Sequence, residues 1–97
     1  MTRGRPKKPR LIKKHPSIVQ FSPRGRPGRP DEITLTVDQI EAVRLADYQG
    51  LEQSQGAQEM GISRATFGRI LREARKLIAD AVTNGKIIRI EGGSIIV

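Results

Sequence analysis

One long amphipathic segment constrains this chain more than any other feature. From residue 63 onward, apolar side chains recur at steps of three and four residues, which places them on one face of an α-helix. Ser63 occupies the N-cap position, and Asn84-Gly85 supplies the stop signal. The pattern predicts a helix over residues 63–83, about 31 Å long at 1.5 Å per residue. The apolar residues of this face are Phe67, Ile70, Leu71, Ala74, Leu77, Ile78, Ala81 and Val82.

A first helix is predicted over residues 37–48. Thr36 and Gln39 have the spacing of a capping box, in which each side chain binds the backbone amide of the other. Asp38 and Glu41 lie in or near the first turn, where negative charge favours the positive end of the helix dipole.

A second helix is predicted over residues 52–60, and a strand pair is predicted at the end of the chain. Gly56 lies inside the second helix and is expected to weaken it by roughly 1 kcal/mol relative to alanine. In residues 86–97, two isoleucine-rich runs flank Gly92-Gly93, which is typical of a β-hairpin.

Charge divides the chain into two parts. Residues 1–30 contain ten Lys/Arg, no Asp or Glu and all six prolines, so the formal charge of +8 divides into +10 there and −2 in residues 31–97. Such a basic, Pro-rich and Gly-rich segment cannot build a core. We therefore predict a disordered basic arm and linker over residues 1–32, followed by a domain over residues 33–97. The fold class is mainly α: a three-helix helix-turn-helix core with a long third helix and a C-terminal β-hairpin.

The spacing of five residues predicts the helix-turn-helix. Ala57 is small enough for a close helix crossing, and Gly61 allows a positive φ in the turn. Ile62 would fill the corner, and Phe67 and Ile70 would anchor the next helix. Together with the basic arm, this arrangement predicts DNA binding through the amino-terminal turns of helix 63–83 in the major groove.

The candidate DNA-binding residues lie opposite the apolar face of helix 63–83 and at the start of helix 52–60. Arginine is the commonest reader of guanine, and small residues allow the backbone to approach DNA. The alternative is a solvated polar face on which Glu73 and Asp80 pair with Arg69 and Lys76 at helical spacing, and it applies above all to Arg75 and Lys76. The candidates here are Gln53, Ser63, Arg64, Ala65, Thr66, Gly68, Arg69, Arg72 and Lys76.

Three stretches resemble a known family: "LTVDQIEAVRLADYQGLEQ", "MGISRATFGRIL" and "NGKIIRIEGG". They are similar to a family of small uncharacterised prokaryotic proteins predicted to bind DNA. The resemblance implies a helix-turn-helix similar to region four of sigma factors, and it implies no ligand or operator. The chain departs from the family pattern at Gly56, where relatives usually have alanine, and this lowers the expected rigidity of the second helix.

Residues 3–10 also resemble an AT-hook. In Arg3-Gly4-Arg5-Pro6, the glycine would let the backbone lie deep in a narrow minor groove, with both arginines along its floor. Lys7 and Lys8 would then return to phosphates. A nonspecific phosphate-binding tail is the alternative. The second copy, residues 24–27, is weaker because acidic residues follow it closely.

We predict that the protein is not an enzyme and binds no cofactor. There is no cysteine, and the single histidine, His15, lies in the arm, so neither a catalytic constellation nor a metal-binding cluster emerges. We predict a transcriptional regulator that acts on double-stranded DNA in the cytoplasm, on the nucleoid, with no membrane partner. An architectural protein of A·T-rich DNA is the main alternative. RNA binding is disfavoured because the chain has only three aromatic residues, which leaves few side chains on which RNA bases could stack.

We also predict a homodimer through the end of the third helix and the C-terminal hairpin. A two-stranded ribbon is barely stable alone, and its six isoleucine and valine residues need a cover. The alternative is a monomer in which residues 18–21 add a third strand to that hairpin. In a dimer, two half-sites would lie about 34 Å apart or a multiple of that.

Overall fold

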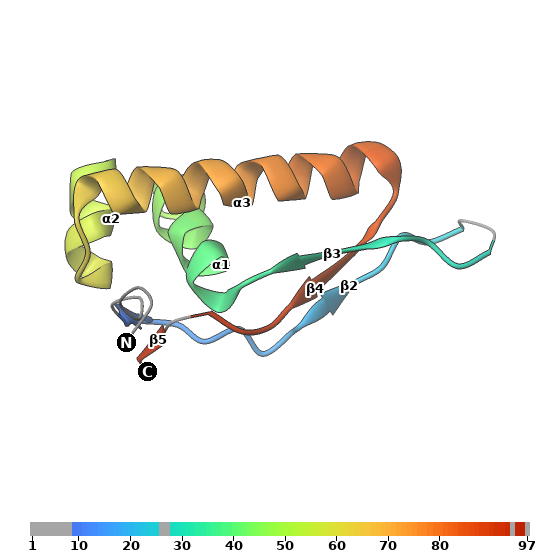
Figure 1. The fold of residues 1–97 in the computed structure, drawn as a ribbon, viewed down its shortest axis with the longest axis horizontal. Coiled ribbons are helices and arrows are strands. Elements are labelled where there is room, and N and C mark those ends of the chain that lie inside the picture. The colour runs from blue at the N-terminus through green and yellow to red at the C-terminus, as the bar shows by residue number, and fades with distance from the viewer. Residues whose placement is uncertain (1–8, 26–27, 94, 97) are drawn as a thin grey trace, which may run out of the picture.

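The computed structural model describes residues 9–25, 28–93 and 95–96. Three helices lie against two small sheets, and the longest helix runs along one side of the molecule, above the two shorter helices and the larger sheet (Figure 1). The two shorter helices pack under the first half of this long helix, and a three-stranded sheet lies under its second half. The long third helix and a strand after it are therefore confirmed.

The helices have nearly the bounds that the sequence predicts. They are α1 (Val37–Val43), continued by a π-helical turn η1 (Arg44–Tyr48), then α2 (Gln53–Met60) and α3 (Arg64–Asn84). The capping box of α1 is present, since the Gln39 amide donates to Thr36 Oγ1 at 3.3 Å and the Thr36 amide donates to Gln39 Oε1 at 2.9 Å. Gly85 ends α3 with φ 64°, a left-handed conformation that favours glycine.

The larger sheet has the order β2-β4-β3, formed by β2 (Gln20–Phe21), β3 (Glu32–Leu35) and β4 (Ile87–Ile90). β3 is parallel to β4, whereas β2 is antiparallel to it. A parallel pair needs a long crossover connection, and here all three helices lie between β3 and β4.

The predicted C-terminal hairpin is wrong. Both edges of β4 are occupied, one by β2 and the other by β3, so β4 has no free edge for the strand that follows it. That strand, β5 (Ile95–Ile96), pairs in parallel with β1 (Arg10–Leu11) instead. Gly92 and Gly93, with φ of 78° and 109°, redirect the chain between β4 and β5.

The arm is not disordered over its described part. β1 and β2 both come from residues that the composition assigned to the arm, and Ile12 is buried at 6% exposure. The open alternative, in which residues 18–21 supply a third strand, holds for Gln20–Phe21, although the sheet that they join contains β3 rather than a hairpin. Both two-residue strands pair with strands from far along the chain, β1 with β5 and β2 with β4, so the sequence of the arm alone does not report them.

The core lies where α3 meets the other elements. Its fully buried large side chains are Leu35, Leu45, Met60, Phe67 and Leu71. These residues come from β3, η1, α2 and α3, so one core is shared by all four elements. Among the described residues, no helix combines the length and the apolar character needed to cross a membrane.

Candidate nucleic-acid interface

The turn between α2 and α3 has the local geometry that the sequence predicts. Gly61 has φ 66°, a conformation that β-carbon sterics disfavour for other residues. The Ile62 amide donates to the Ala57 carbonyl at 3.0 Å, and Ala57 is buried at 3% exposure. Phe67 is fully buried behind the turn. The turn thereby fixes the direction in which α3 leaves α2.

Ser63 and Thr66 cap the start of α3. The Thr66 amide donates to Ser63 Oγ at 3.1 Å, and the Ser63 hydroxyl donates to Thr66 Oγ1 at 2.9 Å. Ser63 is thus confirmed as the N-cap residue. The two hydroxyls are engaged with each other, which leaves the exposed Arg64 and Ala65 as the first side chains of α3 that are open to a partner.

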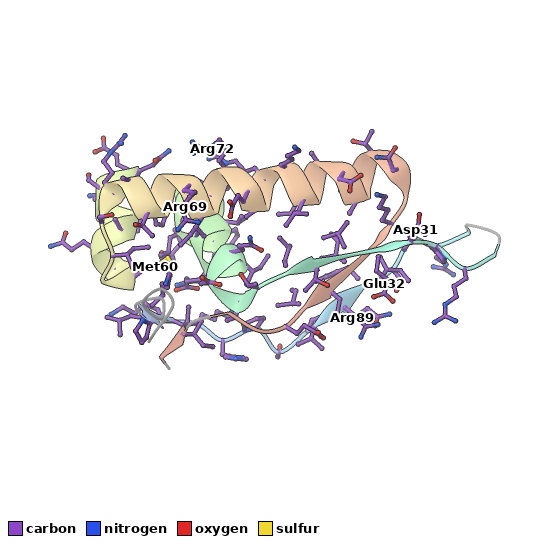
Figure 2. All side chains as sticks on the ribbon, in the orientation of Figure 1. Asp31, Glu32, Met60, Arg69, Arg72 and Arg89 are labelled. Atoms are coloured by element: carbon purple, nitrogen blue, oxygen red, sulfur yellow. The ribbon has the colours of Figure 1, made fainter. Side chains whose placement is uncertain are left out.

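The outer face of α3, which we define as Ala65, Arg72 and Lys76, points away from the rest of the molecule. All three residues are exposed, and Figure 2 shows Arg72 above α3, on the side opposite the other elements. Neither Arg72 nor Arg64 forms an ion pair with a carboxylate of the described residues. Their guanidinium groups therefore retain their full capacity to bind an external anion.

Two arginines of α3 have partners within the fold. Arg69 lies on the side of α3 that faces α1 (Figure 2) and pairs with Glu73 at 3.8 Å, as the ion-pairing alternative predicted. Arg75 donates two hydrogen bonds to the Asp47 carboxylate of η1, at 2.6 and 3.1 Å. These bonds hold the pKa of Asp47 below its ordinary value and raise the pKa of Arg75. The expected Lys76–Asp80 pair is replaced, because Asp80 binds Lys86 at 3.0 Å.

Gln53 and Gly68 come together at the crossing of α2 and α3. A β-carbon on Gly68 would lie 3.0 Å from Gln53 Oε1, so the absence of a side chain at Gly68 admits the glutamine. Gln53 is the first residue of α2, and this contact places it beside the first half of α3. Gln53 of α2 and Gly68 of α3, both predicted to lie in the DNA-binding surface, are therefore adjacent.

The AT-hook-like residues are only partly described by the structure. Arg3, Gly4, Arg5, Pro6, Lys7 and Lys8 lie outside the described residues. Arg10, which the sequence included in the hook-like segment, is buried at 4% exposure, and its Nε lies 3.5 Å from Asp38 Oδ2. A buried arginine cannot also lie along the floor of a DNA groove, so the hook-like segment ends before Arg10.

Two buried carboxylates of α1, Asp38 and Glu41, hold residues 10–13 in place, a role that the sequence did not predict. We call residues 10–13 the strap. Glu41, only 1% exposed, accepts the Lys13 amide at 3.0 Å and two hydrogen bonds from Arg44 at 2.8 Å each. The sequence predicts for Asp38 and Glu41 only a favourable interaction with the helix dipole. Burial of the pair depends on the strap crossing α1, and no local pattern reports that crossing.

A polar cavity of about 420 Å³ lies between the strap and α3. Arg10, Asp38, Arg69, Glu73 and Gly93 are among its lining residues. Its charges are balanced, with two arginines facing two carboxylates, and Asp38 Oδ1 has no hydrogen-bond partner within the described structure. Among the residues described, no cluster of three or more histidine, cysteine or acidic side chains could hold a metal ion.

Comparison with known proteins identifies the family. The family model described as "Protein of unknown function DUF134" matches residues 1–97. This chain belongs to the DUF134 family. The expected membership of a family of small uncharacterised prokaryotic proteins is thereby confirmed, whereas likeness to sigma-factor region four and to an AT-hook stays a prediction.

Relatives in the DUF134 family include several called UPF0251 protein. The one from Desulfosudis oleivorans is 53% identical over 91 residues, which cover 93% of this chain and 66% of the relative. The one from Prosthecochloris aestuarii is 50% identical, with 93% and 59% covered. A third, from Thermoanaerobacter pseudethanolicus, is 48% identical, with 93% and 77% covered. The chain thus spans less than two thirds of the length of the first two relatives. No solved structure matches.

Proposed function

We propose that this DUF134 protein binds double-stranded DNA, with α2 and α3 acting as a helix-turn-helix and the outer face of α3 in the major groove. The observation that carries this proposal is the contrast along α3. Arg69 and Arg75 are paired within the fold, whereas Arg64 and Arg72 are exposed without an ion pair to the described residues. Unpaired guanidinium groups beside a residue as small as Ala65 suit both phosphates and base edges.

The roles within this surface differ. Arg64 and Ala65 in the first turn of α3 would face base edges, with Ser63, Thr66 and Gly68 beside them. Gln53, Arg72 and Lys76 would contact phosphates on either side. Because Arg69 is shared with Glu73, we assign it a phosphate contact that first requires release of this ion pair.

The proposed biological role is transcriptional regulation. A helix surface that reads base edges supports a preference for particular sites, which regulation requires. The charge of the chain supports association with a polyanion, and the basic residues 3–8 would add phosphate or minor-groove contacts. We further propose that the protein acts as a homodimer.

The test begins with selection of bound sequences from random duplex DNA. We expect the double variant Arg72→Gln, Lys76→Gln to bind the selected duplex at least tenfold more weakly than the parent. The slope of log K against log salt should also flatten by about 0.9 for each phosphate that the variant no longer neutralises. Titration of the labelled duplex at several salt concentrations measures both quantities.

Arg75→Gln is the control, and it is compared with the single variant Arg72→Gln, because each removes one positive charge from the same helix and Arg75 is paired with Asp47. The control should bind the selected duplex within twofold of the parent. If a folded Arg72→Gln, Lys76→Gln variant binds as tightly as the parent, the outer face of α3 does not contact DNA and the proposal fails.

A further inference from the structure

Glu73 is an acidic residue set among the cations of the candidate interface. Arg69 and Arg72 precede it on α3, and Arg75 and Lys76 follow it. A duplex on the outer face of α3 would bring phosphates close to this carboxylate, within the screening length of about 8 Å in physiological salt. The charge of Glu73 therefore opposes DNA binding, unless its contact with Arg69 contributes something that offsets the repulsion.

Arg69 and Glu73 form a loose pair on the flank of the outer face. Arg69 Nη1 and Glu73 Oε1 lie 3.8 Å apart, beyond the range of a hydrogen bond, and the two side chains are 45% and 53% exposed. At 3.6 residues per turn, Arg69 lies about 20° round α3 from Lys76, and Glu73 lies about 40° further on. Glu73 lines the polar cavity together with Gln39 of α1, so the pair draws the Arg69 guanidinium away from the outer face (Figure 2).

This pair is weak enough to break when a better anion comes within reach. Exposed ion pairs four residues apart on a helix contribute little to stability. A DNA phosphate, in contrast, accepts short charge-assisted hydrogen bonds from a guanidinium group. Among the described residues, Glu73 is the carboxylate that pairs with Arg69. Arg69 thus has two alternative partners, Glu73 in the free protein and a phosphate in a complex.

We infer that Glu73 is a positioning residue that keeps Arg69 off duplexes which the outer face of α3 does not fit. This inference rests on the proposed function. On a duplex of arbitrary sequence the contacts are electrostatic and loose, and Arg69 stays with Glu73. On the preferred duplex, base-edge contacts by Arg64 and Ala65 seat α3 in the groove and bring a phosphate within reach of Arg69. Glu73 thereby raises the ratio of specific to nonspecific affinity.

Titration of two duplexes with single variants of the full chain tests the inference. The selected duplex and a mixed-sequence duplex of equal length are each titrated at several salt concentrations. Glu73→Gln should bind the mixed-sequence duplex about fivefold more tightly at about 0.15 M salt, because one additional phosphate contact steepens the slope of log K against log salt by about 0.9. Its affinity for the selected duplex should stay within twofold of the parent. Arg69→Gln should do the opposite, with about a fivefold loss on the selected duplex alone.

Two further variants separate the release of Arg69 from the loss of a charge. Asp80→Asn removes the same charge from the same helix, but Asp80 is bound to Lys86 at 3.0 Å and to Asn84 at 2.7 Å. This control should bind both duplexes within twofold of the parent. In an Arg69→Gln background, Glu73→Gln should no longer strengthen binding to the mixed-sequence duplex. Circular dichroism verifies that each variant is folded.

The other outcomes overturn the inference. An unchanged affinity of Glu73→Gln for the mixed-sequence duplex, or equal gains on both duplexes, would show that Glu73 does not withhold Arg69. A loss on the selected duplex would show that Glu73 itself accepts a hydrogen bond from a base, as carboxylates do from cytosine. A gain that persists without Arg69, or that Asp80→Asn reproduces, would reduce the effect to charge. A parent without preference for the selected duplex would leave no specificity for Glu73 to set.

The proposed function is judged separately from these results. If Arg72→Gln, Lys76→Gln weakens binding while Glu73→Gln gives one of the contrary outcomes, the outer face of α3 still binds DNA and only the role of Glu73 is refuted. If Arg72→Gln, Lys76→Gln binds the selected duplex as tightly as the parent, the proposed function fails, together with the inference built on it.

Discussion

At the scale of single residues, Gly56 shows how packing reverses a propensity argument. Glycine inside α2 is a poor helix former, and the sequence alone suggests that alanine would be better by roughly 1 kcal/mol. In the structure, however, a β-carbon at this position would lie 2.5 Å from Phe67 Cζ. Phe67 has no exposed surface, so its ring has no free space into which it can move. The glycine is what allows α2 and α3 to approach this closely.

We therefore predict that Gly56→Ala destabilises the protein by about 1 kcal/mol. Overpacking of a core costs about 1–3 kcal/mol, which exceeds the gain of roughly 1 kcal/mol in helix propensity. Urea denaturation followed by circular dichroism measures the difference. In a Phe67→Leu background the ring is gone, and the same substitution should become neutral or stabilising. Stabilisation by Gly56→Ala alone would show that the two helices separate at little cost.

At the scale of elements, the strap is held by carboxylates for which the sequence predicts only an interaction with the helix dipole. Glu41 binds a backbone amide of the strap and the Arg44 side chain while being almost completely buried. A buried charge is tolerated only when its hydrogen-bonding partners are in place. The side chains of α1 therefore determine where the strap lies.

Glu41→Gln is expected to destabilise the fold by about 3 kcal/mol, because one member of a buried, hydrogen-bonded charge pair is removed. The Lys13 amide should also exchange with solvent faster, which NMR hydrogen exchange measures. Glu59→Gln is the matched control, since Glu59 is half exposed and lies 3.9 Å from Lys13 Nζ, and its removal should cost less than about 1 kcal/mol. Equal effects of the two substitutions would contradict an anchoring role for Glu41.

The strands show a second limit of local reasoning. The isoleucine-rich run of residues 87–90 is a strand, as predicted, yet its neighbours are β2 and β3 rather than the run after Gly92-Gly93. β2 is only two residues long, and β3 lies in the stretch where the linker was expected to end. A hairpin pattern reports which segments can be strands. It does not report that two other segments, β2 and β3, compete for the two edges of β4.

At the scale of the whole molecule, an exposed apolar groove replaces the hairpin as the proposed dimer contact. A groove of about 220 Å³ lies between β2 and the end of α3, and its lining includes Phe21, Pro23, Val82 and Ile88. Phe21 is 54% exposed and Val82 is 75% exposed. Large apolar side chains gathered at one place on a surface are typical of a protein interface.

We predict that the parent protein sediments as a dimer at micromolar concentration and that Val82→Asp sediments as a monomer, because a charge in an apolar interface opposes its formation. Tyr48→Asp is the control, since Tyr48 is 85% exposed on η1 and is not among the residues that line the groove. Analytical ultracentrifugation gives both masses. A monomeric parent would refute the dimer without affecting DNA binding by one subunit.

The sequence by itself determined the three helices, their caps and the turn at Gly61, because apolar periodicity, capping side chains and positive-φ glycines act within a few residues. Helical geometry also predicted that Ala65, Arg72 and Lys76 share one face of α3, whereas Arg69, expected on that face as well, lies on the side toward α1. Only the tertiary structure decided the partners of β4, the burial of Arg10 and Glu41, the need for glycine at position 56, and the pairing of Arg75 with Asp47. Each of these depends on which segments meet in the folded chain, and a local pattern contains no information about such a meeting.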